Sequence, residues 1–149
     1  MDPARIVDVN GRIPGGKWSF GSGYLIAPNL VLTARHVVAD DDGTPFGDLH
    51  VRFVADGRPL SCELAWAGPA GVDAAVLRIV DAGAPECTPV RWGQLAAATP
   101  EIDCEAIGFP LAMQQPDGSR DTDHVTGTIN PGSGLLRGRL HVDVTSSRP

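Results

Sequence analysis

The sequence predicts an all-β domain, and three features of its composition lead to that prediction. The 149 residues are 42% hydrophobic, which is enough for a packed core and argues against wholesale disorder. The 18 glycines and 13 prolines are spread along the chain, so turns recur between short segments. Those segments are rich in Val, Ile, Leu and Phe, the composition of strands. The length is that of one ordinary domain or a piece of a larger one.

The strand-like segments fall into two groups, and the segment between them, residues 81–89, is the best candidate for a linker. The expected strands are residues 5–9, 18–27, 30–33, 49–54, 60–66 and 74–79, followed by 102–108, 123–129 and 135–144. A helical turn is expected at residues 34–38, where the apolar alternation stops, and another turn at 93–99. Strands at this spacing are typical of a sandwich or a barrel.

Charge and cysteine content argue against several functions. The net charge is −6 and no stretch gathers Lys or Arg, so we expect no binding to nucleic acid. No apolar run is long enough to cross a bilayer and the N-terminus carries no secretion signal, so we expect a cytoplasmic protein that does not bind membranes. Cys62, Cys87 and Cys104 form no CxxC pair, which indicates reduced cysteines and neither a zinc site nor a disulfide framework.

One histidine interrupts an otherwise apolar segment, VLTARHVVAD at residues 31–40. Taken alone, His36 is most simply a structural histidine. Two neighbouring features also have plain structural interpretations. Arg5-Ile6-Val7 is similar to a zymogen cleavage site but is expected to be an ordinary first strand, and the acidic stretch at residues 40–42 is expected to be a solvated loop. His50, His124 and His141 have no metal-ligand spacing, so no metal is expected.

Three motifs change the interpretation of His36. GSGYLI at residues 21–26 is followed by NLVLTARHVV at 29–38, DAAVLRI at 73–79 places an acid before a buried strand, and AIGFP occupies 106–110. In this order they resemble the trypsin-like serine peptidases of the chymotrypsin fold, most closely the bacterial members without disulfides. The resemblance covers roughly residues 15–145. It implies one peptidase domain over residues 1–149, a trypsin-like double β-barrel with an N-terminal barrel at 5–80 and a partial C-terminal barrel at 90–149.

The resemblance also implies catalytic roles for His36 and Asp73. His36 would take the proton of a serine hydroxyl, and Asp73 would accept a hydrogen bond from the other ring nitrogen and so select the tautomer. The substrate would be a protein or a peptide, and no cofactor would be needed. Taken singly, Asp73 could instead be a solvated turn residue after residues 70–72. Ser22 is expected to be a strand residue and not a nucleophile.

The sequence departs from the family at the nucleophile. The G-x-S-G-G motif expected beyond Ile129 is missing, and the chain reads LHVDVTSSRP at residues 140–149. Ser133 has flanking glycines, but its context favours a hairpin turn, and Ser146 and Ser147 lack a nearby glycine. We therefore expect a truncated domain whose first barrel is complete, whose second barrel lacks its C-terminal strands, and which is inactive alone.

Two classes of function are compatible with this departure. The parent activity would be that of a cytosolic serine endopeptidase, which a truncation could leave without independent function. The alternative is a non-catalytic binding module, in which a protease fold presents a groove to a partner. Bacterial domains of this kind are often joined to sensor or effector modules, so a C-terminal module outside this chain is compatible with the resemblance.

Overall fold

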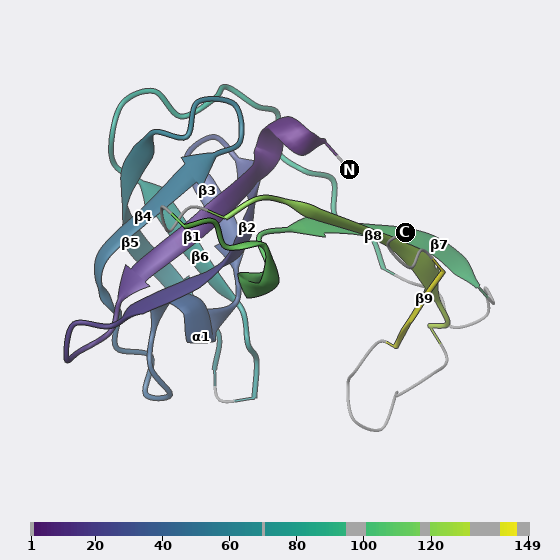
Figure 1. Cartoon of the computed structure of the whole chain (residues 1–149), viewed down its shortest axis with the longest axis horizontal. Helices are drawn as coiled ribbons and strands as arrows, with labels where there is room; N and C mark the ends of the chain where they lie inside the picture. Colours follow the sequence, from purple (N-terminus) through teal and green to yellow (C-terminus); the bar gives the residue numbers. More distant parts are fainter. Residues whose placement is uncertain (1, 70, 95–100, 117–119, 132–140, 146–149) are drawn as a thin grey trace. The chain divides into compact units, whose positions relative to one another are not determined.

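The computed structural model describes residues 2–69, 71–94, 101–116, 120–131 and 141–145, and this part of the chain is all-β (Figure 1). Its strands are β1 (Ile6–Arg12), β2 (Trp18–Ala27), β3 (Leu30–Thr33), β4 (Gly47–Phe53), β5 (Pro59–Ala67), β6 (Ala75–Ile79), β7 (Ile102–Gly108), β8 (Asp123–Ile129) and β9 (Val142–Val144). The helical elements are single turns, namely η1 (Pro3–Arg5), α1 (Arg35–Val38) and η2 (Leu111–Met113).

The predicted fold class is confirmed, with small differences at the ends of elements. The helical turn expected after β3 is present as α1, and β4 begins at Gly47, two residues before its predicted start. The strand expected at residues 135–144 is described only at β9, because residues 132–140 lie outside the described part of the chain. The turn expected at 93–99 also lies largely outside it.

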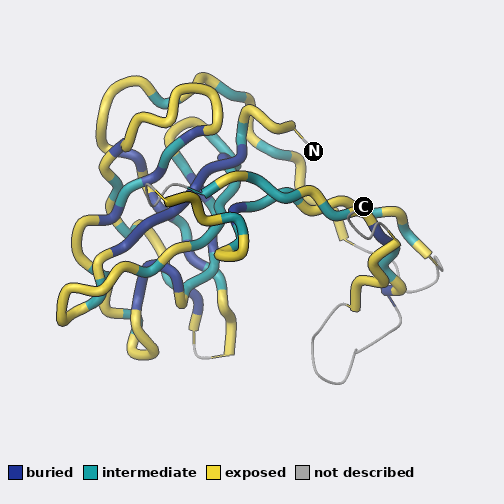
Figure 2. Tube along the Cα trace, viewed as in Figure 1, coloured by how far each residue is buried: buried dark blue, intermediate teal, exposed yellow. Residues whose placement is uncertain are grey.

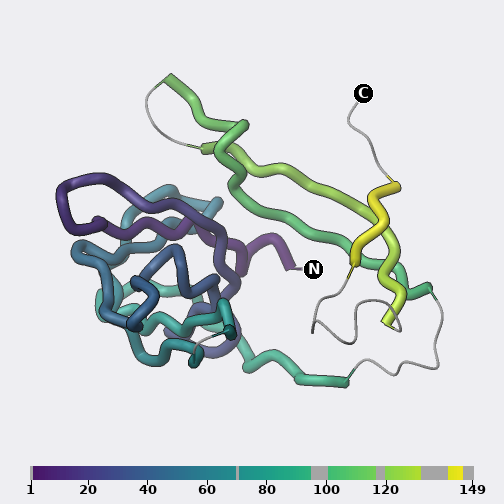
Figure 3. Tube along the Cα trace, turned by 90° about the horizontal axis from the view of Figure 1, so that it is seen from below, coloured from purple at the N-terminus to yellow at the C-terminus, as the bar shows by residue number. Residues whose placement is uncertain are grey.

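The first six strands close into an antiparallel barrel in the order β1-β2-β3-β6-β5-β4. The remaining three form a separate sheet in the order β7-β8-β9, which can be followed in Figure 3. The chain accordingly divides into two compact units. The barrel unit contains residues 2–90 and 108–122, and the sheet unit contains 91–107 and 123–149. The barrel unit therefore includes a segment that lies between β7 and β8 in the sequence.

Alternating side chains fill the barrel. Val9, Leu25, Val31, Val51 and Leu77 are completely buried and belong to one apolar cluster. A strand directs every second side chain to the same face, so the period-2 pattern of the sequence assembles this core directly.

β1 departs from that pattern because both of its faces are buried (Figure 2). Val7 and Val9 point into the core, while Asp8 and Asn10, which alternate with them, are 6% and 3% exposed. Ile6 is also buried; it begins β1, so Ile6 and Val7 are strand residues as expected, whereas Arg5 ends the turn η1. The outward face of β1 must therefore be covered by another part of the chain.

The segment expected to be a linker, residues 81–89, is instead packed on the barrel. Ala84 and Cys87 contact the apolar core. The guanidinium of Arg5 donates to the carbonyl of Thr88 at 2.9 Å, and the backbone N–H of Val90 donates to Ile26 at 2.7 Å. Two apolar side chains in a stretch otherwise typical of turns are enough to hold it against the core.

The three cysteines are free thiols, and each is partly buried. Burial raises the pKa of Cys62 to about 12, and the neighbouring Asp81 carboxylate acts in the same direction. A thiol in such a site behaves as a small apolar side chain. In the described part of the chain, no helix is long and apolar enough to cross a membrane.

Candidate active site

His36 lies in the single helical turn α1, directly after β3. Val37 and Val38 are buried in the barrel core and hold this turn in place, while the His36 side chain is 70% exposed. The turn begins at Arg35, directly after Ala34, whose backbone is still extended. Burial of the two valines thus leaves the imidazole at the surface, at a defined position.

Strand pairing brings Asp73 to the same place. β3 and β6 are antiparallel neighbours, with Thr33 opposite Ala75, so the residues after β3 lie beside those before β6. The backbone N–H of His36 donates to Oδ1 of Asp73 at 3.0 Å, and Nδ1 of the imidazole lies 2.6 Å from Oδ2. The predicted juxtaposition of His36 and Asp73 is therefore observed, and each carboxylate oxygen binds a different group of one residue.

These contacts favour the ionised form of Asp73 and select the tautomer of the neutral His36 ring. The backbone N–H of His36 is the main cause that lowers the pKa of Asp73 below its ordinary value of 3.8. Burial opposes this shift, and the hydrogen bond to the imidazole lowers the pKa further. An ionised carboxylate can only accept, so Nδ1 of the neutral ring carries the proton. The lone pair of His36 then resides on Nε2, and the exposed ring can offer it to a reactant.

We expect Asp73 to titrate below the ordinary range of aspartate. A lowered pKa in the folded state adds stability above the pKa of the unfolded chain, near pH 4, and this stability is lost as the pH falls through the folded value. The ¹³C carboxyl shift of Asp73 should follow the titration. Urea unfolding of wild type should weaken more steeply below about pH 4 than that of Asp73→Asn. A midpoint at or above 3.8 would contradict the hydrogen bonding described here.

The strand next to β3 is also tied to this region. Thr33 donates its hydroxyl to the carbonyl of Ser22 at 2.9 Å, and the Ser22 hydroxyl accepts from the backbone N–H of Phe109 at 2.8 Å. Ser22 thus has the structural role predicted from its position in a strand. Its hydroxyl joins β2 to the segment 108–122 of the barrel unit.

Other polar candidates have structural partners. His50 lies edge-on against Trp18, and His124 contacts the Glu105 carboxylate at 3.1 Å. Asp40 accepts from two backbone N–H groups of its own loop, which is the solvated loop predicted there. In the described ranges no group of three potential ligands could hold a metal ion. Ser133, Ser146 and Ser147 lie outside the described residues.

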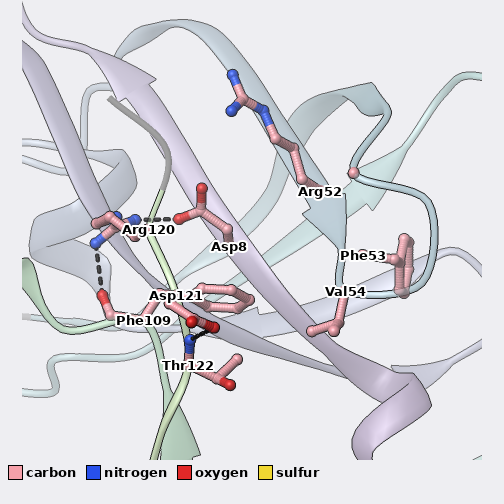
Figure 4. A pocket seen from close by; sticks show the side chains of 9 residues that line it. Asp8, Arg52, Phe53, Val54, Phe109, Arg120, Asp121 and Thr122 are labelled. Carbon is pink, nitrogen blue, oxygen red and sulfur yellow. Dashed lines mark hydrogen bonds and ion pairs between the residues drawn. The ribbon is translucent and has the colours of Figure 1, made fainter. Parts of the chain in front are cut away.

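A cavity of about 240 Å³ lies beside β1 and β4 (Figure 4), and His36 is not among the residues that line it. Its lining includes Asp8 and Arg52 from these strands and Phe109 and Arg120 from the segment 108–122. Neither Asp8 nor Arg120 is among the residues predicted from the motifs. Asp8 is a charged residue between Val7 and Val9, but such alternation is typical of a strand with one face in water, so the sequence gives no signal that Asp8 is buried.

A closed six-stranded antiparallel barrel, with a second, three-stranded sheet after it, is the architecture of a trypsin-like double-barrel protein. The family model described as a trypsin-like peptidase domain matches residues 21–146, and the chain belongs to that family. A comparison with curated proteins found no match.

Solved structures show the same fold. The Rv3671c protease from M. tuberculosis in its active form is 19% identical, with a TM-score of 0.65, and the match covers 95% of this chain and 57% of that one. The HtrA-type protease AlgW with tripeptide is 22% identical, with a TM-score of 0.61, and the match covers 85% and 36%. At these identities the likeness concerns the fold alone. The chain spans little more than half, or less, of the length of these proteases.

Proposed function

We propose that this chain is a serine endopeptidase-type domain in which His36 is the general base and Asp73 orients it. The observation that carries the proposal is the double contact of Asp73 with His36, through the imidazole Nδ1 at 2.6 Å and the backbone N–H at 3.0 Å. Two contacts from one carboxylate hold both the backbone and the ring of His36. They leave Nε2 free to take a proton.

The reaction needs each of these features. A serine hydroxyl is a weak nucleophile near neutral pH, so Nε2 of His36 removes its proton as the oxygen attacks the peptide carbonyl. The resulting imidazolium is stabilised by the Asp73 carboxylate, which stays ionised because its pKa is lowered. His36 then returns the proton to the leaving amine. The substrate class is a protein or a peptide, which agrees with the tripeptide in the AlgW structure.

The 149-residue chain is expected to be inactive alone, because its sequence contains no G-x-S-G-G motif for the nucleophile. Removal of the nucleophile costs about 10⁶ in turnover in a serine peptidase whose triad residues were removed one by one. Incubation with a fluorophosphonate probe should therefore give no stoichiometric labelling. Labelling that disappears in His36→Ala would show that an activated serine is present, and peptide mapping would then test Ser133.

The missing motif also supports a second candidate, a protease-fold binding module without catalysis. The two candidates predict different coding sequences downstream of Pro149. If a longer product carries G-x-S-G-G there, it should react with the probe, and Asp73→Asn should slow that reaction severely, because the wrong tautomer of His36 would be favoured. A longer product that lacks the motif and does not react would favour the binding module.

A further inference from the structure

Arg120 is a buried cation that binds two separate strands of the barrel. Its side chain is 4% exposed and pairs with the Asp8 carboxylate on β1 (Figure 4). Nη2 also donates to the carbonyl of Gly21 on β2 at 3.3 Å, and Nη1 donates to Phe109 of its own segment at 2.7 Å. The guanidinium lies over the Phe20 ring, 4.9 Å from its centroid. One side chain thus joins the segment 108–122 to both β1 and β2.

The energetics of the buried pair of Arg120 and Asp8 indicate that it positions the segments it joins more than it stabilises the fold. Burying two charges costs several kcal/mol in lost hydration, and apolar residues of similar volume often stabilise a fold equally well. An apolar residue cannot form directional hydrogen bonds. The planar guanidinium of Arg120 fixes three acceptors at once, one of them a main-chain carbonyl of β2.

The β2 residue that Arg120 contacts lies directly under the turn that carries His36. A Cβ placed on Gly21 would overlap both methyl groups of Val37, so Val37 rests on Gly21 with no intervening space. The carbonyl of the next residue, Ser22, accepts a hydrogen bond from the hydroxyl of Thr33, the last residue of β3. A displacement of Gly21 and Ser22 would therefore be transmitted to His36 from two directions, because packed interiors leave little room for adjustment.

We propose that Arg120 is a positioning residue for His36. It holds the backbone at Gly21 against the turn α1, and thereby maintains the contact between His36 and Asp73. Its contribution to catalysis rests on the proposed function, whereas the structural coupling does not require any peptidase activity.

The test compares Arg120→Met with wild type by NMR in the intact chain. Methionine keeps much of the apolar volume but makes none of the three hydrogen bonds. The His36 N–H is the main cause of the lowered pKa of Asp73, so we expect the Asp73 titration midpoint to move upward in the variant. The His36 backbone amide should exchange with solvent about tenfold faster, because its charge-assisted hydrogen bond to Asp73 would be weakened.

Arg12→Met is the matched control, because Arg12 also lies on the barrel and pairs with an aspartate, Asp48, but both side chains are more than half exposed. It should leave the Asp73 midpoint and the His36 exchange rate unchanged. If Arg120→Met does not fold, Arg120→Lys gives the same comparison, since an ammonium keeps the charge opposite Asp8 but lacks the planar fork of donors that faces the three acceptors.

The proposal would be overturned if a folded Arg120 variant kept both the wild-type titration midpoint of Asp73 and the wild-type exchange rate of the His36 amide. The outcome is separate from that of the fluorophosphonate experiments, which test the base and the nucleophile. Coupling without any peptidase activity in a longer product would leave Arg120 as a positioning residue of a binding module. Peptidase activity in a longer product, together with an unchanged contact between His36 and Asp73 in the Arg120 variants, would support the proposed function and show that Arg120 has no positioning role.

Discussion

Asp8→Leu should lower the free energy of unfolding by about 3–5 kcal/mol, because it leaves Arg120 buried with no counter-ion. Asp8 also accepts from the side chain of Asn10 at 3.1 Å, and this hydrogen bond is lost as well. The midpoint of urea unfolding measures the effect, provided that the slope of the transition is unchanged. A loss below about 1 kcal/mol would show that Arg120 is not desolvated as described.

The double variant Asp8→Leu/Arg120→Met separates the ion pair from the packing around it. With both charges removed, no buried charge remains unpaired, and most of the stability should return. The exposed pair of Arg12 and Asp48 is the reference, since Arg12→Met should lower the free energy of unfolding by no more than about 1 kcal/mol. If the double variant is as unstable as Asp8→Leu, the loss arises from packing on β1 and not from the orphaned charge.

Leu77→Ala should be comparably destabilising, by about 2–5 kcal/mol, for a different reason. Leu77 is fully buried on β6, opposite Val31 on one side and Leu64 on the other. Truncation removes apolar burial and leaves a cavity that a closed barrel cannot collapse to fill. Chemical denaturation of the intact chain measures the loss.

Leu111→Ala is the matched control for this prediction. It is the same chemical change in a side chain that is 68% exposed, and it should alter the unfolding free energy by less than about 0.5 kcal/mol. Equal effects of the two substitutions would contradict the placement of the core inside the barrel.

The site pair could be predicted because the motifs around His36 and Asp73 resemble those of a known family, although the two residues lie 37 positions apart in the sequence. The buried valines after His36 anchor its turn, and the segment after Asp73 is a strand that pairs with β3. The resemblance named His36 and Asp73 together, and the pairing of β3 with β6 explains why they meet. Their catalytic roles stay predictions, as does the inactivity of the chain alone.

What the sequence determined by itself is the arrangement within each element. Alternation in β1 shows that Val7 and Val9 share one face and that Asp8 and Asn10 share the other. Such a pattern is typical of a strand with one face in water. Only the tertiary structure decided that this second face is covered, by a segment more than a hundred residues further along the chain.

The physical reason is that periodicity records which side chains share a face, and carries no information on what lies against it. Arg120 lies in the stretch DGSRDTD at residues 117–123, which has the composition of a solvated loop. Its burial depends on a carboxylate, a main-chain carbonyl and an aromatic ring that β1 and β2 bring together. Both this ion pair and the pair of His36 and Asp73 form only when the strands of the barrel come together. The motifs around His36 and Asp73 resemble a known family, whereas no motif contains both Asp8 and Arg120, so only the pair of His36 and Asp73 could be predicted.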